Sequence, residues 1–404
     1  MIGGLLLGLV CSASNPAFAQ KSVAEILGRA ATLEGQPKTY LEELMVYGYV
    51  ENSFVYNLGD ASRHKVNSLR FYDADEGYTF NAAEISLKQD SSERYPFGFG
   101  LVVTGGVDSQ KNHSLGIFRS LDDGPPNFRN TPKVDLAEAY ATYRIPIGEG
   151  LTLKAGKWAT LIGWEYYENP KNLNFSRSFL YTLGTPYFHT GLLASYPVAP
   201  WLSISAGFTS GWDNADNNNG YLRPTGSFAF IPSKTVSANV NWIVGPEQNR
   251  NLDNGRHNTR YLVDITVAYT GVDKLTLGLN VDVAGEERDP ALVGAGRSDT
   301  HSNWGGIAGY ASYQWTKALR TALRLDYFKD ADGARSGVRF PGEAINLWET
   351  TLTFEYKIWR GFMTRLEYRH DQADHQVFRV VNPGPAPASR SQDTISLALY
   401  YVFQ

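Results

Sequence analysis

The sequence predicts an all-β fold, a transmembrane antiparallel up-and-down β-barrel of about 16 strands. The last twelve residues, 393–404, alternate large apolar side chains with small or polar ones, and a period of two is typical of a β-strand. Strands of water-soluble sheets usually have about 5–6 residues, whereas a tilted strand needs about 9–11 to cross a bilayer. The length of this strand, its aromatic end at Phe403 and the order of connections described below therefore favour a membrane barrel.

The composition favours one barrel rather than several soluble domains. The chain has 404 residues, including 24 Tyr, 20 Phe, 9 Trp and 39 Gly, and all-β barrels of this size are often single domains. Beyond the N-terminus no apolar run approaches the ~18 residues of a membrane helix, so strands would have to cross the bilayer. The formal net charge of -4 is spread thinly and indicates no nucleic-acid partner.

Residues 1–19 have the pattern of a signal peptide. The apolar run Ile2–Val10 is followed by Ala17-Phe18-Ala19, a small-x-small pattern typical of a signal-peptidase site, so we expect the mature chain to begin at Gln20. The single cysteine, Cys11, lies in this segment, and it lacks the small preceding residue expected of a lipoprotein cysteine. A mature chain without cysteine has no disulfide, thiolate metal site or Cys-x-x-Cys-His haem attachment.

Residues 20–43 form a periplasmic lead-in to a barrel that we place at 44–404. Apolar side chains recur at helical spacing from Val23 to Ala31, and Ser22 is suited to an N-cap, which predicts a short periplasmic helix or a lumenal plug. A mobile lead-in peptide fits this segment equally well.

The expected strands are joined by short and long connections in alternation. The strands lie near 44–57, 78–89, 96–106, 133–145, 150–161, 188–198, 201–211, 226–231, 235–245, 259–270, 275–286, 304–315, 318–330, 347–358, 362–372 and 393–404. Short turns lie at 146–149, 199–200, 232–234, 271–274, 316–317 and 360–361, and long connections at 107–132, 162–187, 212–225, 287–303, 331–346 and 373–392. This alternation is the outer-membrane topology, in which the long connections are extracellular and an even strand number leaves both termini in the periplasm.

The later strands predict a polar lumen. In 318–330, 347–358 and 362–372 one face carries leucine and aromatic residues and the other carries charged residues. A charge on the lipid face costs about 2–4 kcal/mol at the bilayer midplane, so the charged face must look into water. The candidate pore-lining or constriction residues of the whole chain are Lys157, Arg177, His189, Arg320, Arg324, Asp326, Glu349, Glu355, Lys357, Arg365, Glu367 and Arg369.

The lumenal charges admit two interpretations. The last seven strands carry five positive and six negative side chains on this face, a balance that makes no strong selectivity filter. An arginine ladder facing carboxylates would set a transverse field that orients polar solutes. Cross-strand ion pairs that only fill the barrel wall would use the same residues.

The densest motifs of the chain lie between 156 and 218. They are, in order, Gly156-Lys157-Trp158, Gly163-Trp164-Glu165, Asn172-Leu173-Asn174-Phe175-Ser176-Arg177-Ser178, Phe188-His189-Thr190-Gly191 and Gly211-Trp212-Asp213-Asn214-Ala215-Asp216-Asn217-Asn218. They resemble the β-barrel porin-2 family, also called OmpL-like, in which a Gly-x-Glu segment, an Asn-x-Ser-Arg-Ser loop, a Thr-His-Thr-Gly strand start and a Gly-Trp-Asp loop recur; Phe188 replaces the first Thr. The resemblance extends from about Met45 to the C-terminus and implies an outer-membrane porin without a defined substrate.

The long connection 162–187 is the best candidate for a loop that folds into the lumen. Arg177, in a setting of Ser and Asn, could narrow the pore and attract anions, with His189 at the adjoining strand mouth as a second donor. In the alternative interpretation Ser176, Arg177 and His189 hydrogen-bond the loop to the wall, because a loop must satisfy its own backbone.

Two pairs of acidic residues are weak indications of calcium binding and of hydrolysis. Asp213 and Asp216 could bind calcium, but their spacing differs from that of an EF-hand and a solvated turn is favoured. Glu165 and Glu168 could pair for hydrolysis, but proximity in sequence says little about the separation that acid–base chemistry needs. We therefore expect no metal and no cofactor.

The leading functional hypothesis is a passive diffusion channel of the bacterial outer membrane for small hydrophilic solutes, without enzymatic chemistry. Its expected partners are outer-membrane lipid and the solutes, and the strand number is compatible with a homotrimer. One alternative is a barrel that sheaths a partner protein in an electron conduit. A lipid hydrolase using Ser176 or Ser178 with His189 is another, although no nucleophile motif surrounds either serine.

Overall fold

The sixteen strands from residue 45 onward lie close to the ranges that the sequence predicts, and a two-residue strand precedes them. The computed structural model describes residues 21–22, 43–58, 69–70, 73, 76–117, 133–248, 257–288, 300–338, 343–378 and 389–403. The strands are β1 (Lys21–Ser22), β2 (Met45–Asn57), β3 (Gly77–Gln89), β4 (Phe97–Gly105), β5 (Val134–Ile145), β6 (Leu151–Ala159), β7 (Phe188–Ala199), β8 (Leu202–Thr209), β9 (Arg223–Ser233), β10 (Val236–Pro246), β11 (Thr259–Tyr269), β12 (Leu275–Glu286), β13 (Ser302–Gln314), β14 (Leu319–Asp330), β15 (Ile345–Trp359), β16 (Phe362–Ala373) and β17 (Ser391–Phe403). β9 departs most from expectation, since it begins at Arg223 rather than 226.

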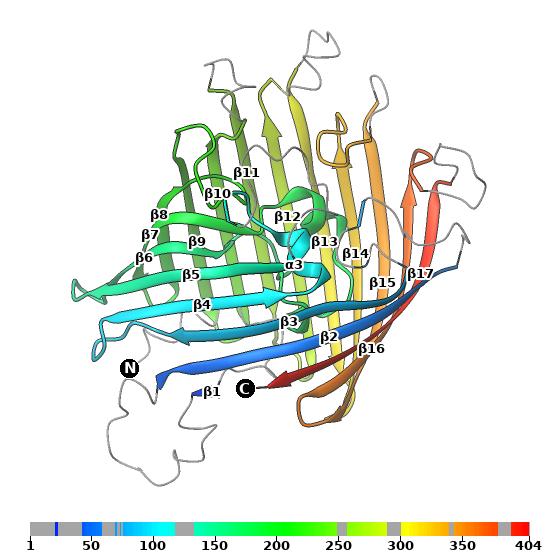
Figure 1. Cartoon of the computed structure of the whole chain (residues 1–404), viewed down its shortest axis with the longest axis horizontal. Coiled ribbons are helices and arrows are strands. Elements are labelled where there is room, and N and C mark those ends of the chain that lie inside the picture. The colour runs from blue at the N-terminus through cyan, green and yellow to red at the C-terminus, as the bar shows by residue number, and fades with distance from the viewer. Residues whose placement is uncertain are drawn as a thin grey trace.

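The sixteen strands from β2 to β17 form a closed antiparallel barrel, which confirms the predicted fold class. β17 pairs with β2 from Thr394 to Phe403, and these strands lie side by side as the red and blue ribbons of Figure 1. At this seam Gly48 faces Phe403: a Cβ on Gly48 would lie 2.2 Å from the ring Cζ and 2.4 Å from the backbone oxygen of Glu84. Only glycine therefore fits where the barrel closes.

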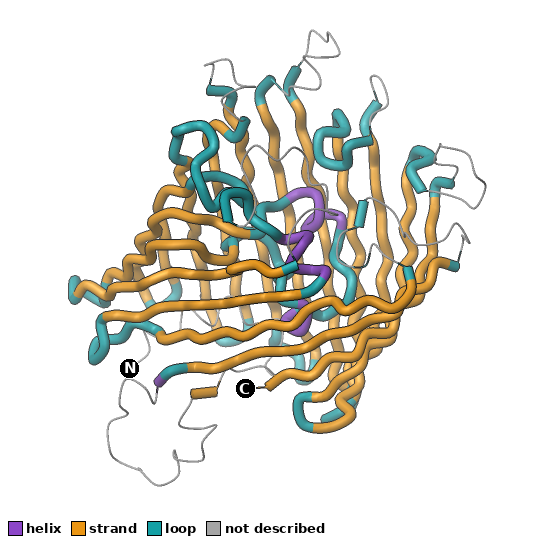
Figure 2. Tube along the Cα trace, viewed as in Figure 1, coloured by secondary structure: helices purple, strands orange, loops and turns teal. Residues whose placement is uncertain are grey.

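Short turns and long connections alternate around the barrel, as expected (Figure 2). The short turns include 146–150, 234–235 and 360–361. Gly361 has a φ of 70°, and a Cβ there would lie 2.1 Å from the backbone oxygen of Val402. The tight β15–β16 turn therefore depends on a residue that tolerates positive φ.

The pleat of the strands separates a lipid face from a lumenal face. Along β15, Leu352, Phe354 and Tyr356 are exposed on the outside, whereas Glu349 and Glu355 are buried inside. The same order recurs on β14, β16 and β17. Apolar side chains thus face the lipid and charged ones face inward, as the alternation predicted.

Residues 160–187, here called the inner segment, leave the wall between β6 and β7 and lie inside the barrel (Figure 2). They include two helical turns, η4 (Asn169–Lys171) and η5 (Leu180–Gly184). Phe179 and Leu180 of the segment belong to a buried apolar cluster that also contains Leu262 and Phe328 of the wall. The segment is therefore packed onto the barrel as a second layer, and the expected inward-folding loop is confirmed.

The described helices are short. The helix α3 (Val107–Asn112) follows β4 and packs against β3, β4 and β5. Within the described parts of the chain, no helix combines the length and apolar character that a membrane span requires. The expected signal peptide, 1–19, and most of the segment 20–43 with its expected helix lie outside the described residues; β1, at Lys21–Ser22, pairs with the start of β2.

Candidate pore constriction

Backbone hydrogen bonds to carboxylates fix the inner segment to the wall. The amide nitrogens of Phe175 and Ser176 donate to the two oxygens of Glu367, at 2.6 and 2.9 Å. The amide of Phe179 donates to Asp326 Oδ2 at 2.7 Å. Hydrogen bonds to ionised acceptors are stronger than neutral ones, so the acidic residues of β14 and β16 hold the segment in place.

Arg324 of β14 joins the inner segment to the wall with its whole guanidinium group. Its Nη1 donates to Glu165 Oε1 at 2.7 Å and to the backbone oxygen of Ser176 at 2.6 Å. Its Nε donates to Glu349 Oε1 of β15 at 2.5 Å. The residue is 0% exposed, so its charge is balanced by carboxylates within the protein and does not face free lumen.

Arg365 and Arg369 of β16 extend this network. Arg365 donates to Glu355 at 2.8 Å and to the backbone oxygen of Asn172 at 2.7 Å. Arg369 donates to Asp371 at 2.6 Å and to the backbone oxygen of Arg177. The arginine ladder thus exists, and each of its inner members ends on the carbonyl groups of the inner segment.

Arg177 braces the inner segment from within. Its Nε and Nη2 donate to the backbone oxygens of Tyr166, at 2.9 Å, and Tyr167, at 3.2 Å, and its Nη1 donates to Asn169 Oδ1 at 2.7 Å. The side chain is 1% exposed. This geometry matches the interpretation in which Arg177 satisfies the loop backbone.

Three other expected lumenal residues lie apart from this network. Lys157 donates to Asp135 at 3.0 Å, and His189 Nε2 lies 2.9 Å from Thr160 Oγ1 at the start of the inner segment. Both Lys157 and His189 are buried. Lys357 is exposed near the end of β15, beside the short turn.

The expected pore residues are thus brought together by the fold, but around the inner segment rather than around open lumen. The residues on the ladder and its acidic partners are Arg320, Arg324, Asp326, Glu349, Glu355, Arg365, Glu367 and Arg369. With Lys157, Arg177 and His189 they are all buried. The cross-strand ion pairs of the alternative interpretation are present, among them Arg320 to Glu355 at 2.9 Å.

Four half-buried residues on or near the inner segment were not among the pore-lining residues expected from the sequence. Tyr166 and Lys171 are half-buried there, as are Lys88 on β3 and Lys154 on β6. Their signal was weak: only the alternation of 78–89 and 150–161 could have placed Lys88 and Lys154 on the lumenal face, and Lys171 lies outside the strands.

Carboxylates with few donors lie behind this face. Asn169 of the inner segment donates to Glu51 Oε1 at 2.6 Å. Within the described residues neither oxygen of Glu84 receives a hydrogen bond from a protein donor, and Glu84 faces Glu168 of the inner segment. The lumen beside β2 and β3 is therefore lined with recessed carboxyl groups.

Asp213, in the loop 210–222, binds the backbone at the start of β7. Its Oδ1 accepts hydrogen bonds from the amides of Tyr187, at 2.7 Å, and Phe188, at 2.8 Å. Burial raises the pKa of Asp213 to about 6, although these two amides oppose the shift. Asp213 thus has a structural task, and within the described residues no group of three His, Cys, Asp or Glu side chains is arranged to hold a metal ion.

Comparison with known families identifies the barrel. Residues 43–403 match the family model described as "Putative beta-barrel porin-2, OmpL-like". The chain belongs to this family. It is an integral porin of the bacterial outer membrane, which confirms the resemblance drawn from the motifs at 156–218. A search of curated proteins found no match.

Solved structures share the fold of this porin at low identity. OprB of Pseudomonas putida, in its high-pH structure, is 12% identical with a TM-score of 0.57, over 96% of this chain and 100% of that chain. An anion-selective porin from Comamonas acidovorans is 10% identical with a TM-score of 0.56, over 89% and 99%. The trimer form of in-vitro folded OmpT from Vibrio cholerae is 10% identical with a TM-score of 0.54, over 89% and 99%.

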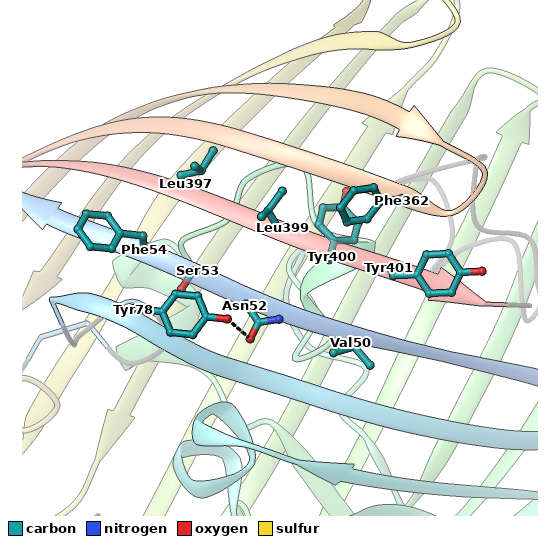
Figure 3. Close-up of a pocket in the computed structure, with 10 residues that line it drawn as sticks. All are labelled: Val50, Asn52, Ser53, Phe54, Tyr78, Phe362, Leu397, Leu399, Tyr400 and Tyr401. Atoms are coloured by element: carbon teal, nitrogen blue, oxygen red, sulfur yellow. Dashed lines mark hydrogen bonds between the residues drawn. The ribbon is translucent and has the colours of Figure 1, made fainter.

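The outer wall of this porin carries a shallow apolar pocket of about 350 Å³. It lies across β16, β17, β2 and β3 and is lined by outward-facing side chains such as Phe54 and Leu397 (Figure 3). One polar pair breaks this surface, since the Tyr78 hydroxyl donates to Asn52 Oδ1 at 2.9 Å. The pocket faces lipid and contributes nothing to the lumen.

Proposed function

We propose that this porin passes small hydrophilic solutes by passive diffusion, through the lumen that remains beside the inner segment. The observation that carries the proposal is the division of the wall: apolar residues face outward on every strand pair described above, and polar or charged residues face inward. Inward-facing charges that the inner segment leaves partly exposed, such as Lys88 on β3 and Lys154 on β6, support a wet path beside it, because a charge needs water or an ionic partner. The inner segment would narrow this wet path without closing it.

The arrangement of the serines argues against the lipid hydrolase. Ser178 Oγ donates to Glu165 at 2.5 Å, and Ser176 Oγ accepts from Arg324 at 3.0 Å, whereas His189 contacts Thr160. The hydrolase hypothesis needs His189 as a base hydrogen-bonded to the serine hydroxyl within about 3 Å, and His189 contacts Thr160 instead. All three side chains are also buried inside the barrel, away from lipid, so we propose a channel and no enzyme.

The inner segment also favours a channel over a sheath for a partner protein. It occupies the interior beside β12 to β16 and packs there into an apolar cluster. A barrel that encloses another protein would have to leave that space empty. We further propose a homotrimer, supported by the likeness to the trimer form of OmpT.

Conductance across a planar bilayer tests the proposal. Refolded protein should give discrete current steps, and liposomes that contain it should swell in small neutral sugars but not in large ones. A correctly folded barrel that gives no steps and no swelling would contradict the open channel. Haem that co-purifies with the protein, or release of fatty acid from phospholipid, would then support the sheath or the hydrolase.

A further inference from the structure

The arginines of the ladder are unavailable to a passing solute. Arg177 and Arg369 are 1% exposed, and Arg324 and Arg365 are 0% exposed. Their guanidinium groups donate to carboxylates and to carbonyl groups of the inner segment at 2.5–3.3 Å. An anion could reach them only by displacing the inner segment, so the attraction of solutes must come from other cations.

Three lysines remain partly open to the lumen. The side chain of Lys88 on β3 is 15% exposed, and that of Lys171 on the inner segment is 23% exposed. Lys154 on β6 is also half-buried. The side chains of Lys88 and Lys171 are more exposed than those of Arg324, Arg365 and Arg369, which are 0–1% exposed. The three lysines come from three separate elements.

The three ammonium groups converge on one region. Lys88 Nζ lies 2.9 Å from Glu138 Oε1, and Lys88, Lys154 and Lys171 all act electrostatically on the Glu138 carboxylate. Tyr167 of the inner segment donates to the same carboxylate at 3.1 Å. The lysines therefore lie near Glu138, in the region between the inner segment and the wall formed by β3 to β6.

Tyrosine rings support two of these lysines. Lys154 Nζ lies 4.4 Å from the ring centre of Tyr140, and Lys171 Nζ lies 5.5 Å from that of Tyr47. Tyr140 lies flat on the wall because Gly100 leaves room for it: a Cβ on Gly100 would be 2.3 Å from the ring Cζ. A cation above an aromatic face is attracted by the ring, so the tyrosines hold these two ammonium groups in position.

The carboxylates of this region are recessed behind the ammonium groups. Glu138 is 5% exposed, Glu168 is 1% and Glu84 is 2%. The total charge is close to balanced, but the surface that a solute meets is positive. A lysine ammonium is compact, hydrated and mobile, so it can attract an anion without retaining it, as conduction requires.

We propose that Lys88, Lys154 and Lys171, with the tyrosines beneath them, are the residues that determine solute selectivity, and that the favoured solutes carry a carboxylate or another small anionic group. This proposal rests on the channel function proposed above. In this proposal the three lysines, and not Arg177, are the cations of the constriction that face the solute.

The reversal potential under a KCl gradient tests the proposal. Lys154→Gln and Lys171→Gln should each lower the ratio of chloride to potassium permeability by about two- to fivefold, the effect of one charge at contact distance in water. The triple variant with Lys88→Gln should show the largest shift. Lys317→Gln removes the same charge from a short turn outside the lumen and should leave the ratio unchanged.

Flux of matched solutes gives a second measurement. In liposome swelling, the triple variant should slow the entry of gluconate more than that of glucose, which has nearly the same size. Current steps with an unchanged reversal potential in all three lysine variants would overturn the proposal while leaving the channel intact. Absence of steps in the wild-type protein would overturn both. Heat-modifiable electrophoretic mobility should confirm that each variant is folded.

Discussion

At the scale of single residues, burial decides the role of each charged side chain. Arg177 stands in the motif most suggestive of a pore, yet its donors are all directed at the inner segment itself. Lys171, six positions earlier, has one ion-pair partner, Glu168, and partial exposure. Two cations of the same segment therefore have different tasks, one in holding the backbone and one in meeting the solute.

Replacement of Arg177 should affect stability and leave charge selectivity unchanged. Arg177→Ala would leave the backbone oxygen of Tyr167 without its Arg177 donor, whereas that of Tyr166 would keep Asn172 Nδ2 at 2.9 Å. The cost should be about 1–3 kcal/mol. Urea unfolding in detergent, followed by tryptophan fluorescence, should show the loss, and Arg177→Lys should not restore it because lysine lacks the planar fork. A reversal potential of Arg177→Ala that shifts toward cation selectivity would contradict this expectation, because it would show that Arg177 meets the permeating ions.

Asp213 should make stability depend on pH. The buried carboxyl has a pKa of about 6 against an ordinary value of 3.8, so the folded protein holds its proton more tightly than the unfolded chain does. The stabilisation is therefore complete below about pH 4 and is lost as pH rises through about 6. Asp213→Asn keeps an oxygen acceptor and tolerates the positive φ of 54°, and it should remove this dependence.

Unfolding of the two proteins across pH 4 to 8 measures the effect. Wild type should lose stability relative to Asp213→Asn as the pH rises between 4 and 6, and the difference should be constant above 7. A difference that does not change with pH would show that the Asp213 carboxyl titrates normally.

At the scale of elements, the inner segment behaves as part of the wall. It has apolar contacts on one side, carboxylate anchors at Phe175, Ser176 and Phe179, and arginine donors on its carbonyl groups. Few of its backbone groups are left to water, so we expect it to be rigid on the timescale of solute passage. Opening and closing of this porin would then not depend on its movement.

Loss of one anchor should make the channel noisy. Glu367→Gln leaves a single side-chain oxygen for the two amides of Phe175 and Ser176, and its NH2 group would face a donor. We expect larger and fluctuating single-channel currents, since the inner segment would sample positions away from β16. Glu149→Gln, an exposed change on a short turn, is the matched control, and steady wild-type currents in Glu367→Gln would contradict the anchoring role.

At the scale of the whole molecule, the barrel depends on closure between its ends. β17 pairs with β2 and so joins the two ends of the sheet, and Phe403 occupies the space beside Gly48. A closed barrel has no free strand edge, whereas an open one exposes unpaired backbone to lipid. The seam is therefore the place where a small change should have the largest consequence.

Gly48→Val should impair closure of the barrel. Its side chain would collide with the backbone oxygen of Glu84, 2.4 Å from the Cβ position, as well as with Phe403. The folded, fast-migrating species in unheated electrophoresis should decrease strongly. Gly309→Val on β13 is the control, because nothing lies within 4 Å of its Cβ position; equal yields from both variants would show that the seam tolerates a side chain.

The sequence by itself determined the barrel, its number of strands as about sixteen and the lipid and lumenal faces, and it indicated 162–187 as the candidate for an inward-folding connection. These follow from local patterns: alternation sets the faces, and turn residues set the ends of strands. Only the tertiary structure decided which charges meet the lumen. Arg324 and Glu165 are 159 positions apart. No local pattern shows that the inner segment covers Arg324, or that Lys88, Lys154 and Lys171 stay partly exposed. Burial depends on what packs against a residue, which a single strand does not encode.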